Sequence, residues 1–273
     1  MSDSHEPLPP LPARDPRGHK GTFGAVAVVG GCALRPTDDE PAASQMVGGP
    51  AFAALAALRS GAGLARLVVP EPLMAAGLAI APSATGVALG VDQRGAVVAH
   101  LAAAALDEVL LDAQCVAIGP GLGHGEGPRA IAMRAIAQIE APIVLDADAL
   151  NALVEIPEFH RDFRAAAVLT PHVGEFRRLA GALGATIDPV AKPQAAAEDL
   201  ARRLGAVVVL KSAATIVTDG HRTWTHDSPN SALATAGSGD VLAGLIAGLI
   251  AQLHRRPLGA GSATITSERQ GGL

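Results

Sequence analysis

The sequence is poor in aromatic residues and in clustered positive charge. Only 2% of its 273 residues are aromatic, Tyr is absent, and the net charge is -5. Its basic residues form nothing longer than pairs such as Arg202-Arg203 and Arg255-Arg256. Proteins that bind an extended nucleic acid use a basic surface and aromatic rings on which bases stack. We therefore expect no nucleic-acid partner, and any bound phosphate must be held by a local site.

Long hydrophobic runs and a signal peptide are missing as well. Val241–Ala251 is among the longest apolar stretches, and it is far shorter than the ~20 residues that cross a bilayer. The N-terminus is polar and rich in proline, whereas a signal peptide has a basic start and an apolar core. We expect a soluble, cytoplasmic chain with no membrane partner, in which residues 1–18 are a disordered lead.

Cysteine is scarce too. Cys32 and Cys115 lie far apart and match no spacing typical of a metal or redox motif. We expect two reduced thiols with a structural role.

What the sequence does have is Ala, Gly and Val, and 49% of its residues are hydrophobic. Short apolar runs alternate with Ala-rich helical patterns. The predicted strands are Ala25–Val29, Leu64–Val69, Cys115–Ile118, Ile143–Leu145, Val168–Thr170 and Ala206–Lys211. The predicted helices are Pro50–Ser60, Val97–Asp112, Pro128–Ile139, Gly174–Ala180 and Ala191–Leu204. Arg35–Met46 is predicted to be a loop, and Thr215–Val217 and Thr223–Thr225 to flank a hairpin turn.

This order predicts one α/β domain. A central, mostly parallel sheet carries helices on both faces, in three layers, and has an antiparallel edge. Ligands of such sheets bind beyond the carboxyl ends of the strands.

The most informative stretch is Asn230–Ala251, in which a Gly/Ser-rich turn runs into an apolar helix. Gly237, Ser238 and Gly239 can bring backbone N–H groups close to a phosphate, and the helix dipole favours an anion there. Asp240 follows in the first turn, beside that phosphate, where it can act as a base. If the segment stood alone, an ordinary helix start with an acidic first turn would be the preferred explanation.

Other candidate residues lie where predicted strands end. The GPGLG turn, with Gly119, Gly121 and Gly123, allows close backbone approach to a ligand, although a plain strand–helix turn is an equal alternative. Asp146 and Asp148 in LDADALN can hold a hydrated Mg²⁺ or ligand hydroxyls. Capping of the next helix by Asp148 is the alternative.

Two further strand ends carry polar side chains. In LTPHVGEF, Pro171 fixes a turn, His172 projects at the strand end and Glu175 lies in the next helical turn; a capped surface turn is the alternative. Lys211 can meet a phosphate, pair with an acid or simply reach solvent. Asn230 can contact a ligand or cap its own turn.

Taken together, these motifs resemble a known family. KGTFG at Lys20–Gly24, VVGG at Val28–Gly31 and AALRSGAGL at Ala56–Leu64 precede GPGLG, LDADALN, LTPHVGEF, the Lys211 segment and NSALATAGSGDVLAG. From Lys20 to Gln252 the chain resembles the NAD(P)H-hydrate dehydratase family of the ribokinase-like superfamily. The combination of LDADALN, TPHxGEF and GSGD is specific to that family.

The resemblance implies a ribokinase-like fold and conversion of (6S)-NAD(P)H hydrate to NAD(P)H. ADP, or ATP, would be the co-substrate with Mg²⁺, and ADP would give AMP and phosphate. By position, Asp240 would be the catalytic base. The hydrated dinucleotide would contact Gly49, the glycines of GPGLG, His172 and Asp240. The nucleotide would contact Lys211, Ser212, Ala213, Ala214, Thr215, Gly237, Ser238, Gly239 and Asn230.

The resemblance also implies a homo-oligomer and a functional link to an NAD(P)H-hydrate epimerase. The chain departs from the family at Gly49, where Ala is usual, and at Ser212, where Gly is usual. We expect the domain to span residues 19–255 and residues 256–273 to be a short polar tail where the family has further helical segments. An alcohol kinase of the thiazole or pyrimidine type and a degenerate nucleotide-binding paralogue remain alternative hypotheses.

Overall fold

The computed structural model describes residues 10, 11, 13–36 and 43–254. The predicted polar tail at 256–273 and residues 1–9 and 12 of the predicted lead lie outside these residues. Within them, no helix combines the length and the apolar character of a membrane span.

The α/β prediction is confirmed by a nine-stranded sheet in the order β11-β10-β9-β8-β7-β6-β1-β4-β5. Seven neighbouring strands are parallel, and β10 and β11 form the antiparallel edge. The strands are β1 (Ala25–Val29), β4 (Leu64–Pro70), β5 (Thr85–Leu89), β6 (Cys115–Ile118), β7 (Ile143–Leu145), β8 (Ala167–Leu169), β9 (Val207–Leu210), β10 (Thr215–Thr218) and β11 (Thr223–His226).

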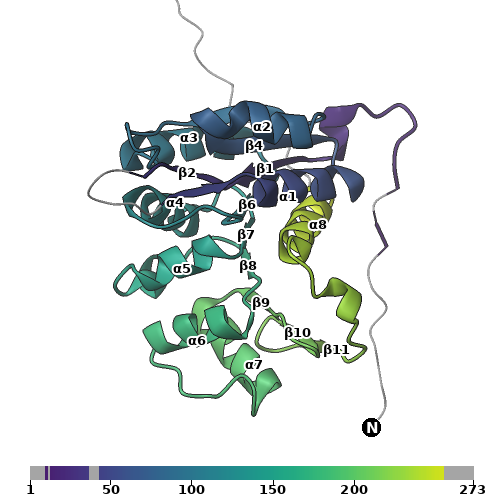
Figure 1. Ribbon diagram of the computed structural model, residues 1–273. Helices are drawn as coiled ribbons and strands as arrows, with labels where there is room; N and C mark the ends of the chain where they lie inside the picture. The colour runs from purple at the N-terminus through teal and green to yellow at the C-terminus, as the bar shows by residue number, and fades with distance from the viewer. Residues whose placement is uncertain (1–9, 12, 37–42, 255–273) are drawn as a thin grey trace, which may run out of the picture.

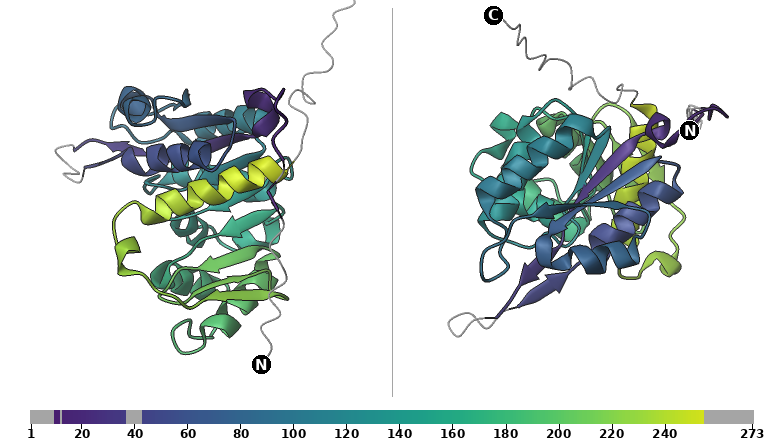
Figure 2. Two further views of the ribbon diagram at one scale, coloured as in Figure 1. Left: turned by 90° about the vertical axis from the view of Figure 1, so that its right-hand side faces the viewer. Right: turned by 90° about the horizontal axis from the view of Figure 1, so that it is seen from above.

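Helices cover both faces of the sheet and enclose two hydrophobic cores (Figure 1). One face packs against α3 (Ala99–Asp112), α4 (Glu126–Ala137), α5 (Asp148–Val154), α6 (Val173–Ala182) and α7 (Pro193–Leu204). The other packs against α1 (Gly48–Arg59), α2 (Met74–Ile80) and α8 (Ser238–Leu253). Figure 2 shows α8 running across the sheet beside α1.

Small residues allow α1 and α8 to pack closely. A Cβ atom on Gly244 of α8 would collide with the carbonyl oxygen of Ala53 in α1, and one on Gly248 would lie 2.9 Å from the carbonyl oxygen of Ala57. On the same face of α8, Ala243, Ala247 and Ala251 are fully or almost fully buried. This contact fixes where α8 begins relative to the start of α1.

The strand order places a topological switch point beside β1. The chain pairs β4 with β1 on one side and returns to pair β6 on the other. In parallel sheets, the loops that diverge at such a point leave a crevice at the carboxyl edge. The turns after β6, β7, β8 and β9 lie at this edge, and the start of α8 reaches it as well.

The prediction of a loop at Arg35–Met46 is wrong at its end. Ser44–Met46 forms β3, which pairs antiparallel with β2 (Cys32–Leu34). The polar sequence of β3 gives no strand pattern, and its backbone is ordered by pairing with β2. We also made no prediction for α2 and β5, which complete the edge of the sheet beyond β4.

Candidate active site at the carboxyl edge of the sheet

The start of α8 presents Asp240 and free backbone N–H groups to the crevice. Gly237 precedes the helix with φ of +87° and supplies no capping side chain. The amides of Gly239 and Asp240 have no acceptor among the described residues. Unpaired amides and the helix dipole together favour a bound anion. The glycine turn therefore has the features that were predicted for a phosphate site.

Asp240 faces the first turn of α1. A Cβ atom on Gly49 would lie 3.1 Å from Asp240 Oδ1 and 3.2 Å from Oδ2. The glycine thus leaves room beside the carboxylate where a larger side chain would press on it. A ring of Phe52 from the same helix lies against Gly237, since a Cβ there would be 3.1 Å from the ring. Sequence reasoning did not single out Phe52.

The surroundings of Asp240 make it a stronger base than an ordinary aspartate. Burial raises its pKa most, the negative charge of Asp146 raises it further, and Asp148 adds a smaller effect in the same direction. The positive charge of Lys211 opposes them. A raised pKa makes a carboxylate better suited to accept a proton.

Asp146 and Lys211 form an ion pair next to Asp240. Lys211 Nζ donates to Asp146 Oδ1 at 2.6 Å, and Thr170 Oγ1 donates to the same oxygen at 2.7 Å. The three residues follow β7, β8 and β9, which are neighbours in the sheet. A Cβ atom on Gly239 would lie 3.4 Å from Lys211 Nζ. Lys211 therefore pairs with an acid, one of its predicted alternatives, and its ammonium also lies beside the first turn of α8.

Asp148 does not cap α5 as the capping alternative predicted. The position before the helix is taken by Ala147, whose φ is +49°, and Asp148 begins the helix. Its Oδ2 instead accepts a hydrogen bond from the amide of Gly123 at 2.9 Å. The side chain thereby ties the end of the GPGLG turn to the start of α5.

The GPGLG turn is held in a conformation that favours glycine. Gly119, Gly121 and Gly123 have φ values of +122°, +59° and +76°. A Cβ atom on Gly119 would also collide with the carbonyl oxygen of Asp146. Backbone conformation and close packing both explain these glycines, so the plain-turn alternative accounts for their local structure.

Three of the four carboxylate oxygens in LDADALN already accept hydrogen bonds within the protein, and the magnesium site expected there stays a prediction. Asp146 Oδ1 already accepts from Lys211 and Thr170, and the two oxygens of Asp148 accept from Gly123 and Asn151. Mg²⁺ is usually held by one or two free carboxylates with water and phosphate oxygens. Across the described ranges, no group of three or more His, Cys, Asp or Glu side chains is arranged to hold a metal.

His172 lies at the same edge but its ring caps α6. Its Nδ1 accepts from the amides of Gly174 and Glu175 at 2.9 and 3.3 Å, and its own amide donates to Glu175 Oε2. The predicted capped turn is therefore present. The backbone of His172 bridges to Lys211, which places the half-exposed ring near the nucleotide segment.

The predicted nucleotide segment is a tight turn between β9 and β10. Ser212 Oγ donates to the carbonyl oxygen of Ala214 at 2.6 Å, and Thr215 Oγ1 donates to that of Ser212 at 3.2 Å. Ser212 and Ala213 are exposed. Asn230 lies in a separate turn, where its side chain accepts from the amide of Ala232, as the capping alternative predicted.

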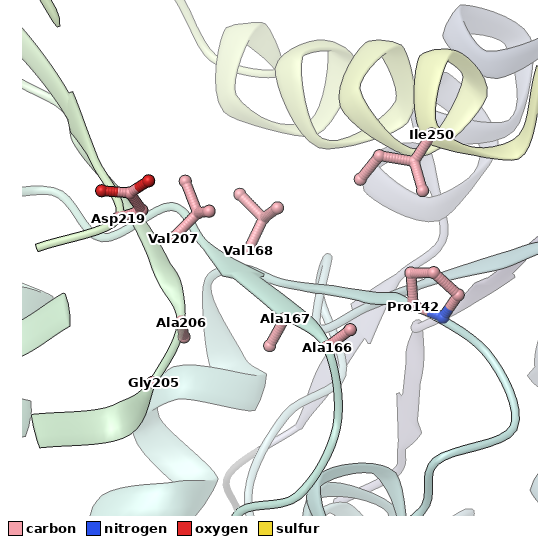
Figure 3. Close-up of a pocket in the computed structure, with 9 residues that line it drawn as sticks. All are labelled: Pro142, Ala166, Ala167, Val168, Gly205, Ala206, Val207, Asp219 and Ile250. Carbon is pink, nitrogen blue, oxygen red and sulfur yellow. The ribbon is translucent and has the colours of Figure 1, made fainter. Parts of the chain in front are cut away.

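A cavity of about 300 Å³ lies elsewhere, near the amino ends of β7, β8 and β9 (Figure 3). Ile250 of α8 faces Val168 and Val207 of the sheet across it. Its acidic residue, Asp219, accepts from the amides of His221 and Arg222 in the hairpin turn. This cavity is apolar and lacks the groups that converge around Asp240.

Comparison with known proteins reveals relatives along most of the chain. A sequence model of the family described as NAD(P)H-hydrate dehydratase matches residues 42–270. The ADP-dependent (S)-NAD(P)H-hydrate dehydratase of Xanthomonas campestris is 38% identical over 89% of this chain and 77% of its own length. A bifunctional NAD(P)H-hydrate repair enzyme of Salinibacter ruber is 39% identical over 93% of this chain. The chain spans 44% of that relative.

The fold is also shared with solved structures. The ADP/ATP-dependent NAD(P)H-hydrate dehydratase of Bacillus subtilis, crystallised with ATP and Mg²⁺, has a TM-score of 0.68 and is 30% identical. The match covers 90% of this chain and 79% of the other. Together with the strand order, this similarity confirms the ribokinase-like fold expected from the sequence.

Proposed function

Because the chain belongs to the NAD(P)H-hydrate dehydratase family, we propose that it dehydrates (6S)-NAD(P)H hydrate to NAD(P)H. ADP is the phosphoryl donor and becomes AMP. The observation that carries this proposal is the position of Asp240. Its carboxylate lies against Gly49 of α1, and it belongs to the first turn of α8, where two amides have no acceptor among the described residues.

The chemistry follows from a poor leaving group. Asp240 accepts the proton of the C6 hydroxyl group. The oxygen of that hydroxyl attacks the terminal phosphorus of ADP, and the bond from this phosphorus to AMP breaks. The ring nitrogen lone pair then expels phosphate by breaking the C6–O bond. Loss of a proton from C5 forms the C5–C6 double bond of NAD(P)H. A general base of this kind raises the reaction rate by about 10²–10⁴-fold.

The remaining predicted residues receive binding roles. The nucleotide contacts the turn of Lys211, Ser212, Ala213, Ala214 and Thr215, together with Gly237, Ser238 and Gly239 and, from its separate turn, Asn230. The hydrated dinucleotide contacts Gly49, Gly119, Gly121, Gly123 and His172. The positioning of donors around the transferring phosphoryl group is the main requirement of such reactions, and the unpaired amides of α8 support this assignment.

We propose that Mg²⁺, if required, enters with the nucleotide and is held by its phosphate oxygens and by water. Asp146 Oδ1 and both oxygens of Asp148 already accept hydrogen bonds, which supports this arrangement over a dedicated protein site. The metal would neutralise phosphate charge. No proton transfer in the scheme depends on it.

The biological setting is also a proposal. We assign the chain to the cytoplasm, where reduced nicotinamide cofactors are used, and the buried free thiols of Cys32 and Cys115 agree with a reducing compartment. We propose a single catalytic domain at residues 19–255 that acts as a homo-oligomer. An NAD(P)H-hydrate epimerase is its functional partner, as the bifunctional names of the relatives suggest.

A product assay tests the function. Purified protein is incubated with ADP and hydrated NADH, and the absorbance band of reduced nicotinamide is followed while AMP and phosphate are measured. We expect the band to appear with one AMP and one phosphate per NADH formed. A stable phosphorylated product without the band would instead identify an alcohol kinase. Nucleotide binding without any turnover would identify a degenerate paralogue.

A further inference from the structure

Asp146 is the most enclosed charged group near the site, and the scheme above gives it no role. It is 2% exposed, at the end of β7. A buried carboxylate is costly unless it is paired and hydrogen bonded. Its Oδ1 accepts from Lys211 Nζ and from Thr170 Oγ1, so the charge is paired and its orientation is fixed by a second element.

The lysine in this pair has donors to spare. An ammonium group carries three N–H donors, and Lys211 Nζ uses one on Asp146 and contacts no other acceptor in the described part of the chain. The ammonium lies beside Gly239, whose amide is also without an acceptor. The remaining donors and the amides of the first turn of α8 therefore converge on one place.

Without Asp146, nothing in these contacts would keep the ammonium there. Lysine has a long, flexible side chain that otherwise extends toward solvent. The side chain of Lys211 is 22% exposed, so solvent is within its reach. The carboxylate thus acts as the anchor of a cation at the start of α8.

We propose that Asp146 is a positioning residue that holds the Lys211 ammonium against the transferring phosphoryl group, and that it is not a metal ligand. Thr170 orients the carboxylate for this task. The inference rests on the proposed function in so far as the anion is the terminal phosphate of the nucleotide. It assigns to Asp146 an effect on the bound anion that acts through Lys211, beside the direct effect of the Asp146 charge on Asp240.

A double-mutant cycle tests this dependence. Asp146→Asn, Lys211→Met and the double variant are compared with the wild type in kcat/KM for ADP. Loss of a charge-assisted contact is expected to cost each single variant about 10–100-fold. The double variant should resemble Lys211→Met within about threefold, because interacting residues are not additive. Asp107→Asn, which breaks the ion pair with Arg134 in the α3–α4 pair, is the matched control and should match the wild type.

Magnesium dependence separates the two roles of the carboxylate. A positioning residue leaves the Mg²⁺ concentration at half-maximal rate unchanged in Asp146→Asn. Recovery of activity by excess Mg²⁺, or losses in the single variants that multiply in the double variant, would overturn the proposal. If Asp146→Asn does not fold, Thr170→Val replaces it in the cycle with Lys211→Met. Losses in kcat/KM that multiply in the Thr170→Val, Lys211→Met double variant would also overturn the proposal.

Failure of the proposed function would give a different pattern. The four proteins are also compared by calorimetric binding of ADP, which needs no turnover. If the wild type binds ADP without dehydrating the hydrate, the dehydratase proposal fails. If the double variant then binds ADP as weakly as Lys211→Met and no more weakly, anchoring of Lys211 by Asp146 is still supported. Affinity losses of the two single variants that multiply in the double variant would refute it.

Discussion

Replacing Gly244 by Ala tests how the fold positions the carboxylate of Asp240. Gly244 packs on the backbone of Ala53, and α1 also carries Gly49, which faces Asp240. Exchange of Gly for Ala inside a helix normally stabilises by about 1 kcal/mol. Here the new methyl group would collide with a carbonyl oxygen that cannot rotate away, and forcing atoms into a packed contact costs about 1–3 kcal/mol.

The upper value of about 3 kcal/mol applies because the collision is with backbone, so the net loss in the free energy of unfolding is about 2 kcal/mol. At about 2–4 °C per kcal/mol, Tm should fall by roughly 4–8 °C. The control is Gly181→Ala in α6, where no atom lies within 4 Å of the new Cβ. It should stabilise by about 0.5–1 kcal/mol. Calorimetric melts and kcat are measured for both.

We expect Gly244→Ala to lose stability and turnover together, since separating α1 from α8 moves Gly49 away from Asp240. Gly181→Ala should keep the wild-type kcat. A Gly244→Ala protein that melts higher than the wild type, as the control should, would refute the close-packing explanation.

Three further outcomes are expected. Because burial and the charge of Asp146 raise the pKa of Asp240, the folded state binds a proton more readily than the unfolded one, and stability falls as pH rises through that raised pKa. Asp240→Asn should therefore raise Tm at neutral pH but not in acid, at pH values below the ordinary pKa range of aspartate. If the Tm difference between the variant and the wild type were the same at every pH, the raised pKa of Asp240 would not be its cause. Gly49→Val should abolish turnover while ADP still binds, as measured by calorimetry; full activity would show that Gly49 does not border the substrate. Burial raises the pKa of Cys115, so a thiol reagent should modify it only on unfolding, and rapid labelling of the native protein would contradict its burial.

The local elements could be predicted because their signals are local. The end of β7 at Leu145 and the turn after β9 at Lys211 follow from apolar runs that stop at polar or glycine residues. The position of Asp240 in the first turn of α8 follows from the glycines before it. Since parallel strands end at one edge, a common site for these residues was also predictable.

The partners of these residues could not be predicted. Lys211 pairs with Asp146, 65 residues away, and the sequence left a phosphate, an acid and solvent as open alternatives. Asp148 accepts from the amide of Gly123 and does not cap α5, because the strand order brings the two turns together. The strand at Ser44–Met46 has no apolar pattern and depends on pairing with β2. Each of these contacts is set by tertiary structure.

Proton transfer to Asp240 is tested most directly by comparing wild type and Asp240→Asn in the rate of AMP formation from ADP and hydrated NADH, with ADP affinity measured on the same samples. We expect AMP formation to fall by about 10²–10⁴-fold while ADP binds with its wild-type affinity. An Asn variant that forms AMP and NADH at the wild-type rate would contradict the role of Asp240 as the base.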